Sequence, residues 1–113
     1  MSDEQLSFFD VVYNVRAMRR IKTDPVPLAL MMKVLNAGVQ APSGQNLQPW
    51  KFVLIRDDEK KLWFAQRYTQ AIESRFKFSR DNPQAKPPGK QLKALYYQMD
   101  HMHEYPYLLL VCG

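Results

Sequence analysis

The chain has 113 residues and a formal net charge of +5, with 46% hydrophobic and 24% charged residues. This length suits one domain over residues 1–113, and the apolar fraction argues against wholesale disorder. A single cysteine, Cys112, excludes an intrachain disulfide and a metal site built from cysteines alone. No apolar run approaches the ~18 residues of a membrane helix. The first residues lack the pattern of a signal peptide, so we expect a cytoplasmic protein.

The first half of the chain predicts two helices joined by an extended segment. Ser7 is a suitable N-cap for a helix over residues 7–15, whose apolar residues recur at helical spacing. Each proline in residues 24–27 disfavours the α region for the residue before it, so this segment is extended. Pro27 suits the first turn of a second helix, which carries apolar residues at helical spacing as far as Val39.

The middle of the chain predicts a strand followed by a third helix. Residues 50–55 are rich in aromatic and β-branched side chains, which is typical of a largely buried strand. Asp57 or Asp58 can cap the helix that follows. We expect the charged start of this helix, residues 58–61, to be solvated, with its acids favoured by the helix dipole.

The last third predicts a loop, a fourth helix and a second strand. Residues 79–90 contain three prolines and a glycine, which indicates a loop. The fourth helix carries an apolar stripe that ends at His103. His101 lies two positions earlier, on a different helix face, so we expect no metal site. Residues 107–113 predict a second buried strand, with Cys112 as a small buried hydrophobic side chain.

The order helix, helix, strand, helix, helix, strand predicts an α+β fold. Two strands do not form a stable sheet by themselves. A hydrophobic strand at the end of the chain also needs something to cover it. We therefore expect a chain that is incomplete after its second core strand, or one that depends on a partner.

One short segment after the first helix concentrates positive charge through Arg16, Arg19 and Arg20. Guanidinium groups at this spacing in an extended stretch can converge on one phosphate, whose oxygens accept paired hydrogen bonds. A solvated basic turn is the alternative. The other lysines and arginines are dispersed, as on a solvated surface. A nucleic-acid-binding domain is less well supported, because the cluster is short and no recognition motif accompanies it.

A second segment, residues 41–50, reads Ala-Pro-Ser-Gly-Gln-Asn-Leu-Gln-Pro-Trp and lies between a helix and a strand. Ser43, Gln45 and Asn46 offer hydroxyl and amide groups, and Gly44 permits close approach to the backbone. Such a loop suits the polar edge of a flat heterocycle. An ordinary helix-to-strand connection is the alternative.

Together these two segments resemble the FMN-dependent nitroreductase family. That family opens with a basic motif of the form Arg-Arg-Ser-x-Arg, then Pro-Val-Pro and a helix, then Ala-Pro-Ser-x-x-Asn-x-Gln-Pro-Trp and a strand. Here residues 25–27 read Pro-Val-Pro, and residues 41–50 match the later motif closely. The resemblance covers most of the chain and is weak between Lys60 and Met99. It implies a three-layer α/β/α sandwich, of which this chain would be the N-terminal part.

The resemblance also implies the binding residues. The family's basic motif holds the phosphate and ribityl chain of FMN, and its counterparts here are Arg16, Ala17, Arg19 and Arg20. Ala17 stands where a serine is usual, so only a backbone contact is available there. The second motif contacts the isoalloxazine ring, usually of the flavin held by the other subunit. Its residues here are Pro42, Ser43, Gly44, Gln45 and Asn46.

From the resemblance we expect a homodimeric flavoenzyme with FMN at the subunit interface. NAD(P)H would supply a hydride, and a nitroaromatic, quinone or similar conjugated compound would accept it. The flavin performs the chemistry and the protein positions it, so we expect no catalytic side chain. The alternative is a non-catalytic or fragmentary member that binds flavin or a partner without turnover. Neither nucleic acid nor a membrane is expected as a partner.

Overall fold

The computed structural model describes residues 6–76 and 89–113. Its elements are α1 (Phe8–Asn14), α2 (Leu28–Gly38), the 3₁₀ helix η1 (Gly44–Asn46), β1 (Lys51–Ile55), α3 (Asp58–Phe76), α4 (Lys90–His101), the 3₁₀ helix η2 (Met102–Glu104) and β2 (Leu108–Cys112). The two strands pair antiparallel in one sheet, with Lys51 opposite Cys112 and Ile55 opposite Leu108. The predicted α+β class is confirmed.

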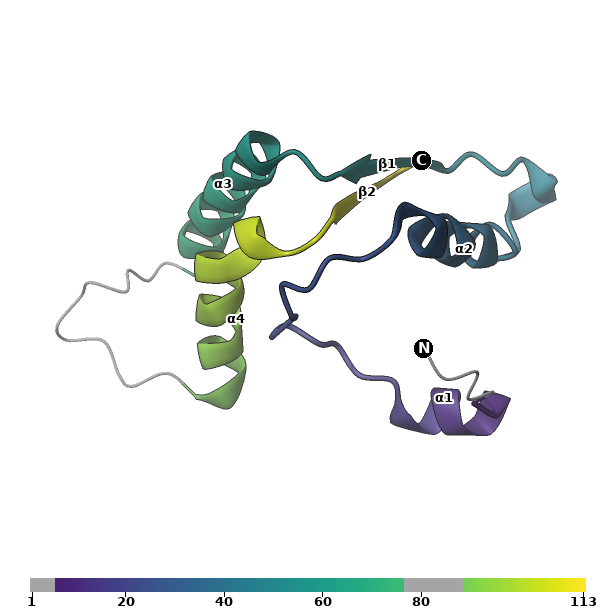
Figure 1. Ribbon diagram of the computed structural model, residues 1–113, viewed down its shortest axis with the longest axis horizontal. Helices are drawn as coiled ribbons and strands as arrows, with labels where there is room; N and C mark the ends of the chain where they lie inside the picture. Colours follow the sequence, from purple (N-terminus) through teal and green to yellow (C-terminus); the bar gives the residue numbers. More distant parts are fainter. Residues whose placement is uncertain (1–5, 77–88) are drawn as a thin grey trace, which may run out of the picture.

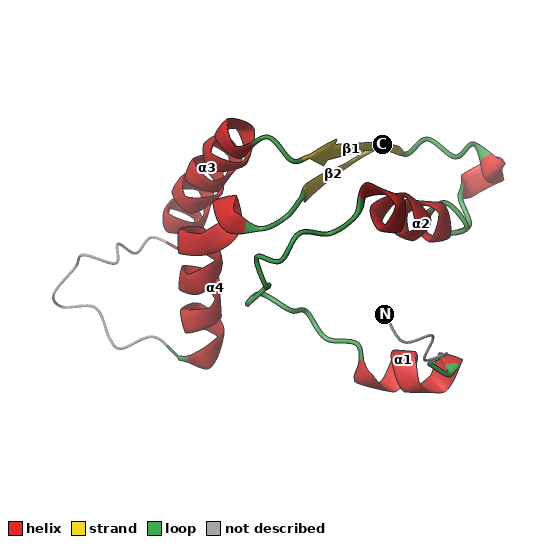
Figure 2. Ribbon diagram, viewed as in Figure 1, coloured by secondary structure: helices red, strands yellow, loops and turns green. Residues whose placement is uncertain are grey.

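The sheet lies between two helical regions (Figure 1). α3 and α4 lie at one end of the strands, α2 lies near the other end, and α1 lies farther away. Figure 2 shows a long loop between α1 and α2, and loops on both sides of η1 between α2 and β1. The Cα radius of gyration is 17.2 Å, whereas a globular chain of this length has about 13 Å. The fold is therefore open, with much of its surface available to other structure.

Local capping sets where the predicted helices begin. The Ser7 hydroxyl accepts a hydrogen bond of 3.1 Å from the Asp10 amide at the start of α1. The Asp57 carboxylate accepts one of 2.9 Å from the Lys60 amide at the start of α3. These bonds satisfy amides that have no partner within the helix. α2 differs slightly from expectation, because Pro27 is its N-cap rather than its first helical residue.

The strands are half-buried, and the prediction of two largely buried strands is wrong. Exposed and covered residues alternate along β1, and only Ile55 is buried. Leu109 and Val111 of β2 are also exposed. The covered face of β1 lies against α2. There, Phe52 Cζ lies 4.0 Å from the position that a Cβ atom would have at Gly38. A two-stranded sheet covered on one face must expose alternate residues, since successive side chains point in opposite directions.

Cys112 is exposed and has a free thiol, so the expectation of a buried side chain is wrong. It lies at the last pair of the β-ladder, opposite Lys51, which is exposed as well. The apolar composition of residues 107–113 predicted that Cys112 is buried. Its position at the end of the sheet leaves it exposed instead.

The fourth helix is shorter than its apolar stripe. α4 ends at His101, and His103 belongs to η2, so the prediction that His103 continues the helix is wrong. Most of the predicted loop over residues 79–90 lies outside the described residues, and Lys90 begins α4. Within the described part of the chain, no helix has the length and apolar character needed to cross a membrane.

The core lies where α3, α4 and the chain after η2 meet. Its buried hydrophobic residues among those described are Ile55, Ala65, Met99 and Tyr105. By contrast, α1 and α2 contribute no buried residue. The molecule therefore has a small packed region at the α3–α4 end and a loosely attached α1–α2 end.

Lys61 is part of this packed region, although a solvated helix start was expected there. Its side chain is only 7% exposed. Its Nζ donates a hydrogen bond of 2.8 Å to the carbonyl oxygen of Tyr105 and lies 3.2 Å from the Asp58 carboxylate. Lys61 and Ala65 are four residues apart and so share the helix face that packs on η2 and Tyr105. The local charge pattern contains no sign of this packing.

Two tyrosines after η2 connect the packed region to the segment between α1 and α2 through hydrogen bonds. The Tyr105 hydroxyl donates a hydrogen bond of 2.6 Å to the carbonyl oxygen of Arg19. The Tyr107 hydroxyl donates one of 3.0 Å to the carbonyl oxygen of Val26. Burial, followed by the nearby Tyr97, Tyr68 and Glu104, raises the pKa of Tyr105 above its usual 10.0. The Tyr105 hydroxyl therefore stays protonated, and able to donate, at neutral pH.

Replacing Lys61 by methionine should destabilise the chain. Lys61→Met leaves the buried carbonyl of Tyr105 without its donor, which should lower the free energy of unfolding by about 1–3 kcal/mol. Lys60→Met changes the neighbouring exposed lysine and should stay within about 0.5 kcal/mol of the parent. Urea unfolding followed by circular dichroism measures both. Equal destabilisation by the two variants would contradict the assigned role of Lys61.

The chain should lose stability in alkali. Because the pKa of Tyr105 is raised on folding, its contribution is complete below the unfolded value of about 10 and is lost as pH rises through the folded value. Urea midpoints measured at increasing pH should therefore fall above about pH 10. Tyr105→Phe removes this titration and should make the fall shallower. The same slope in both proteins would refute the assignment to Tyr105.

Candidate functional site

The basic segment lies in the extended chain between α1 and α2. Arg16 is exposed and folds back on the end of α1, where its Nη1 donates to the carbonyl oxygens of Tyr13 at 3.2 Å and Val15 at 2.7 Å. A cation is favourable at this end of a helix, where carbonyl groups lack partners. Ala17 beside it is exposed as well, which leaves its backbone accessible.

Arg19 and Arg20 lie against the α3–α4 end of the molecule. The Arg19 backbone is held by Tyr105, and the Arg20 guanidinium lies 4.8 Å from the centre of the Tyr97 ring, a cation–π contact. Among the described residues, the Arg19 guanidinium has no hydrogen-bond or ion-pair partner. Burial raises the pKa of Tyr68, and the positive charge of Arg19 acts in the opposite direction. The segment thus has a backbone held at Arg19, and positive charge that no acidic side chain in residues 6–76 and 89–113 is shown to pair with.

The loop after α2 is shaped by its own side chains. The Ser43 hydroxyl accepts a hydrogen bond of 3.0 Å from the Gln48 amide, and Gln48 Nε2 donates one of 3.0 Å to Asn46 Oδ1. Pro42, Gln45 and Asn46 are exposed, whereas Ser43 is half-buried. Ser43 therefore stabilises the turn, and the amides of Gln45 and Asn46 remain at the surface.

The backbone of this loop is unusual at three residues, of which Gln48 was not among the predicted site residues. Gln45, Asn46 and Gln48 have positive φ angles of 54°, 53° and 47°. A left-handed conformation costs a residue with a Cβ about 1–2 kcal/mol, and only asparagine adopts it readily among these types. Such conformations gather at functional sites. Nothing in the sequence indicates a left-handed conformation at the two glutamines.

Gly44 was expected to permit close approach to the backbone. A Cβ built at this position would meet no atom of the chain within 4 Å, and Gly44 does not have a positive φ. Packing within the chain therefore does not require glycine here. The space beside Gly44 is open to a group from outside.

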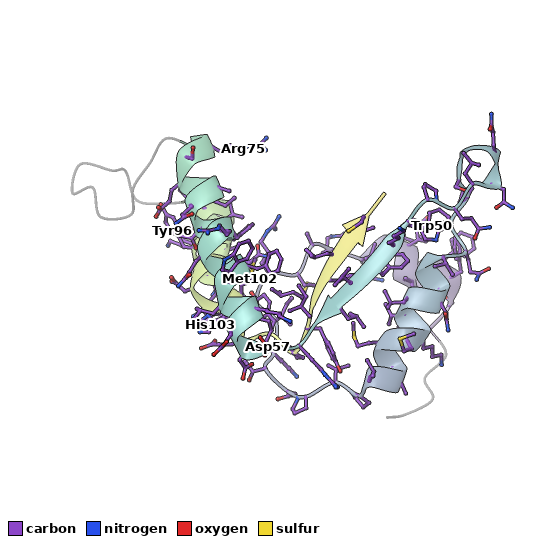
Figure 3. All side chains as sticks on the ribbon, turned by 90° about the horizontal axis from the view of Figure 1, so that it is seen from above. Trp50, Asp57, Arg75, Tyr96, Met102 and His103 are labelled. Carbon is purple, nitrogen blue, oxygen red and sulfur yellow. The ribbon has the colours of Figure 1, made fainter. Side chains whose placement is uncertain are left out.

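The structure does not bring the two predicted segments together within one chain. Figure 1 shows the basic segment between α1 and the α3–α4 pair, and η1 beyond the far end of α2. Figure 3 shows Trp50, where the loop leads into β1, at the opposite end of the strand from Asp57. The two segments lie apart, with the sheet and α2 between them.

The donors in the two segments suit the two parts of a flavin mononucleotide. The arginines of the basic segment match a phosphate ester, and the exposed amides of Gln45 and Asn46 match the polar edge of a ring. Among the described residues, no three His, Cys, Asp or Glu side chains are grouped so that they could hold a metal ion.

Comparisons with known proteins agree with these features. A family model described as "Nitroreductase family" matches residues 14–112. Iodotyrosine deiodinase of Thermotoga neapolitana is 30% identical over 91% of this chain and 54% of its own length. A protein named NADH dehydrogenase of Thermus thermophilus is 48% identical over 46 residues, which are 41% of this chain and 22% of that protein.

A solved structure extends the likeness to the fold. It is the crystal structure of oxidised iodotyrosine deiodinase bound to FMN and 3-iodo-L-tyrosine. The TM-score is 0.69 at 26% sequence identity, over 91% of this chain and 54% of that one. The chain spans about half the length, or less, of these relatives. The predicted family resemblance is confirmed, and the chain belongs to the nitroreductase family.

Proposed function

We propose that this chain serves an FMN-dependent oxidoreductase that passes a hydride from NAD(P)H to a nitroaromatic, quinone or similar conjugated acceptor. The observation that carries the proposal is the basic segment, which contains Arg16, Arg19 and Arg20: the Arg19 backbone is fixed, and its guanidinium has no partner among the described residues. A dianionic phosphate is the ligand that such a cluster recognises best. Membership of a family with an FMN-bound member supports the same conclusion.

In this proposal the chain's own residues bind and orient, and the flavin supplies the hydride chemistry when bound. Arg16, Arg19 and Arg20 hold the phosphate, and the backbone at Ala17 contributes a further donor. The ring lies against the second half-site, made by Pro42, Ser43, Gly44, Gln45 and Asn46. No side chain of this chain acts as a nucleophile or a general base.

We propose that the two halves of one site come from two copies of the chain. The separation of the halves within one chain supports this assembly (Figure 1). α1 also presents Phe8, Phe9 and Tyr13, which are 73%, 65% and 71% exposed. Apolar surface of this extent suits a contact with another protein surface. A homodimer would cover α1 and complete the flavin site in one step.

The names of the relatives suggest which compounds to test. Iodotyrosine deiodinases recur among them, and one is solved with 3-iodo-L-tyrosine bound. Halogenated tyrosines therefore belong in the acceptor panel beside nitroaromatics and quinones. The relative named NADH dehydrogenase makes NADH a donor to compare with NADPH. Flavin absorbance bleached by either nucleotide, and restored by an acceptor, would identify the pair.

The alternative is a member that binds flavin or a partner without turnover. Desalted protein that retains flavin, but is not reduced by NADH or NADPH, would favour this alternative. Flavin that is both retained and reduced would favour the enzyme.

Replacing Arg19 by alanine should weaken FMN binding about ten- to hundredfold, because a charge-assisted hydrogen bond to phosphate is lost. Riboflavin, which lacks the phosphate, should bind the parent and the variant equally. Arg75→Ala removes the same charge from the last turn of α3 and serves as the control. Flavin fluorescence titration measures these affinities. Equal losses for Arg19→Ala and Arg75→Ala would refute a specific phosphate contact.

A further inference from the structure

Tyr105 and Tyr107 flank Pro106 and hold the basic segment at two points. The Tyr105 hydroxyl bonds to the carbonyl oxygen of Arg19 at 2.6 Å, across 86 positions of sequence. The Tyr107 hydroxyl bonds to the carbonyl oxygen of Val26 at 3.0 Å, across 81 positions. One contact is thus made at the arginines themselves, and the other is made near the start of α2.

Tyr105 is itself firmly placed. Its side chain is 3% exposed, and its own carbonyl oxygen accepts the hydrogen bond from the buried Lys61 at 2.8 Å. Its raised pKa keeps the hydroxyl protonated at neutral pH. The donor that reaches Arg19 is therefore anchored to α3, in the best-packed part of the molecule.

The next arginine is braced by the same region. The Arg20 guanidinium lies 4.8 Å from the centre of the Tyr97 ring, and that ring stacks on His101 with centroids 4.2 Å apart. His101 Nδ1 lies 2.6 Å from the Glu104 carboxylate. Arg19 is thus held through its backbone and Arg20 through its side chain, from neighbouring elements.

We propose that Tyr105 is a positioning residue for phosphate recognition, acting through the Arg19 backbone. This inference rests on the proposed function. An extended segment that moves freely must lose that freedom when it binds a ligand, which weakens binding. The Tyr105 hydroxyl removes part of this cost in advance, because it fixes the peptide that follows Arg19 and so limits the directions from which the Arg19 side chain can reach a phosphate.

Tyr105→Phe tests the inference, since it removes only the hydroxyl. FMN affinity should fall about three- to tenfold, the effect of one lost hydrogen bond, while riboflavin affinity stays unchanged. Tyr107→Phe removes the same group from the contact with Val26 and should leave FMN affinity within about twofold of the parent. A general structural loss would weaken FMN and riboflavin together, which would overturn the inference.

A double variant shows whether Tyr105 acts through Arg19. Arg19→Ala removes the guanidinium but keeps the carbonyl that Tyr105 holds. In that background Tyr105→Phe should have little further effect on FMN affinity, because fixing the backbone no longer orients the Arg19 guanidinium. Fully additive losses would overturn the inference.

Trypsin digestion under native conditions separates the failure of this inference from failure of the proposed function. Loss of the Tyr105 hydroxyl should speed cleavage after Arg19 and Arg20, whereas Tyr107→Phe should leave these two cleavages unchanged. A parent protein that takes up no FMN would overturn the proposed function alone. Equal cleavage rates for the parent and Tyr105→Phe would overturn the positioning role, with or without flavin.

Discussion

The hydrogen bonds that run from Lys61 through Tyr105 to Arg19 join the two ends of the molecule. The α3–α4 end has a packed core, whereas α1 and α2 contribute no buried residue to it. Hydrophobic burial therefore does not fix the segment that carries the arginines. Polar contacts made by buried or half-buried donors fix it instead, and such contacts are directional and costly to leave unmade. The geometry of the basic segment depends on them.

The sequence predicted the features that local chemistry controls. Ser7 and Asp57 cap their helices through side chains only three residues from the amides they bind, so the residue types alone reveal the helix starts. The burial of Lys61 depends on Tyr105, which lies 44 positions away. The exposure of Cys112 depends on its place in the β-ladder. No pattern within a short window contains that information.

The candidate site, too, could be predicted only in part from the sequence. Its residue types and their order were readable, because the arginines and the Pro42–Asn46 loop follow a family pattern, and the family is confirmed. Their separation across the molecule was not readable, since spacing in sequence does not give distance in space. The left-handed backbone angles at Gln45 and Gln48 could not be predicted either, because glutamine disfavours that conformation. The loop's shape comes from hydrogen bonds of Ser43 and Asn46 within the folded turn.

The spacing of Tyr105 and Tyr107 limits how this part of the chain can vary. Tyr105 is extended, with φ −66° and ψ 146°, and Pro106 after it has a restricted φ. Both hydroxyls nevertheless reach the segment between α1 and α2, Tyr105 at Arg19 and Tyr107 at Val26. Inserting or deleting one residue here would turn one hydroxyl away, even if both tyrosines were kept. The length of this short stretch is therefore under stronger constraint than its composition.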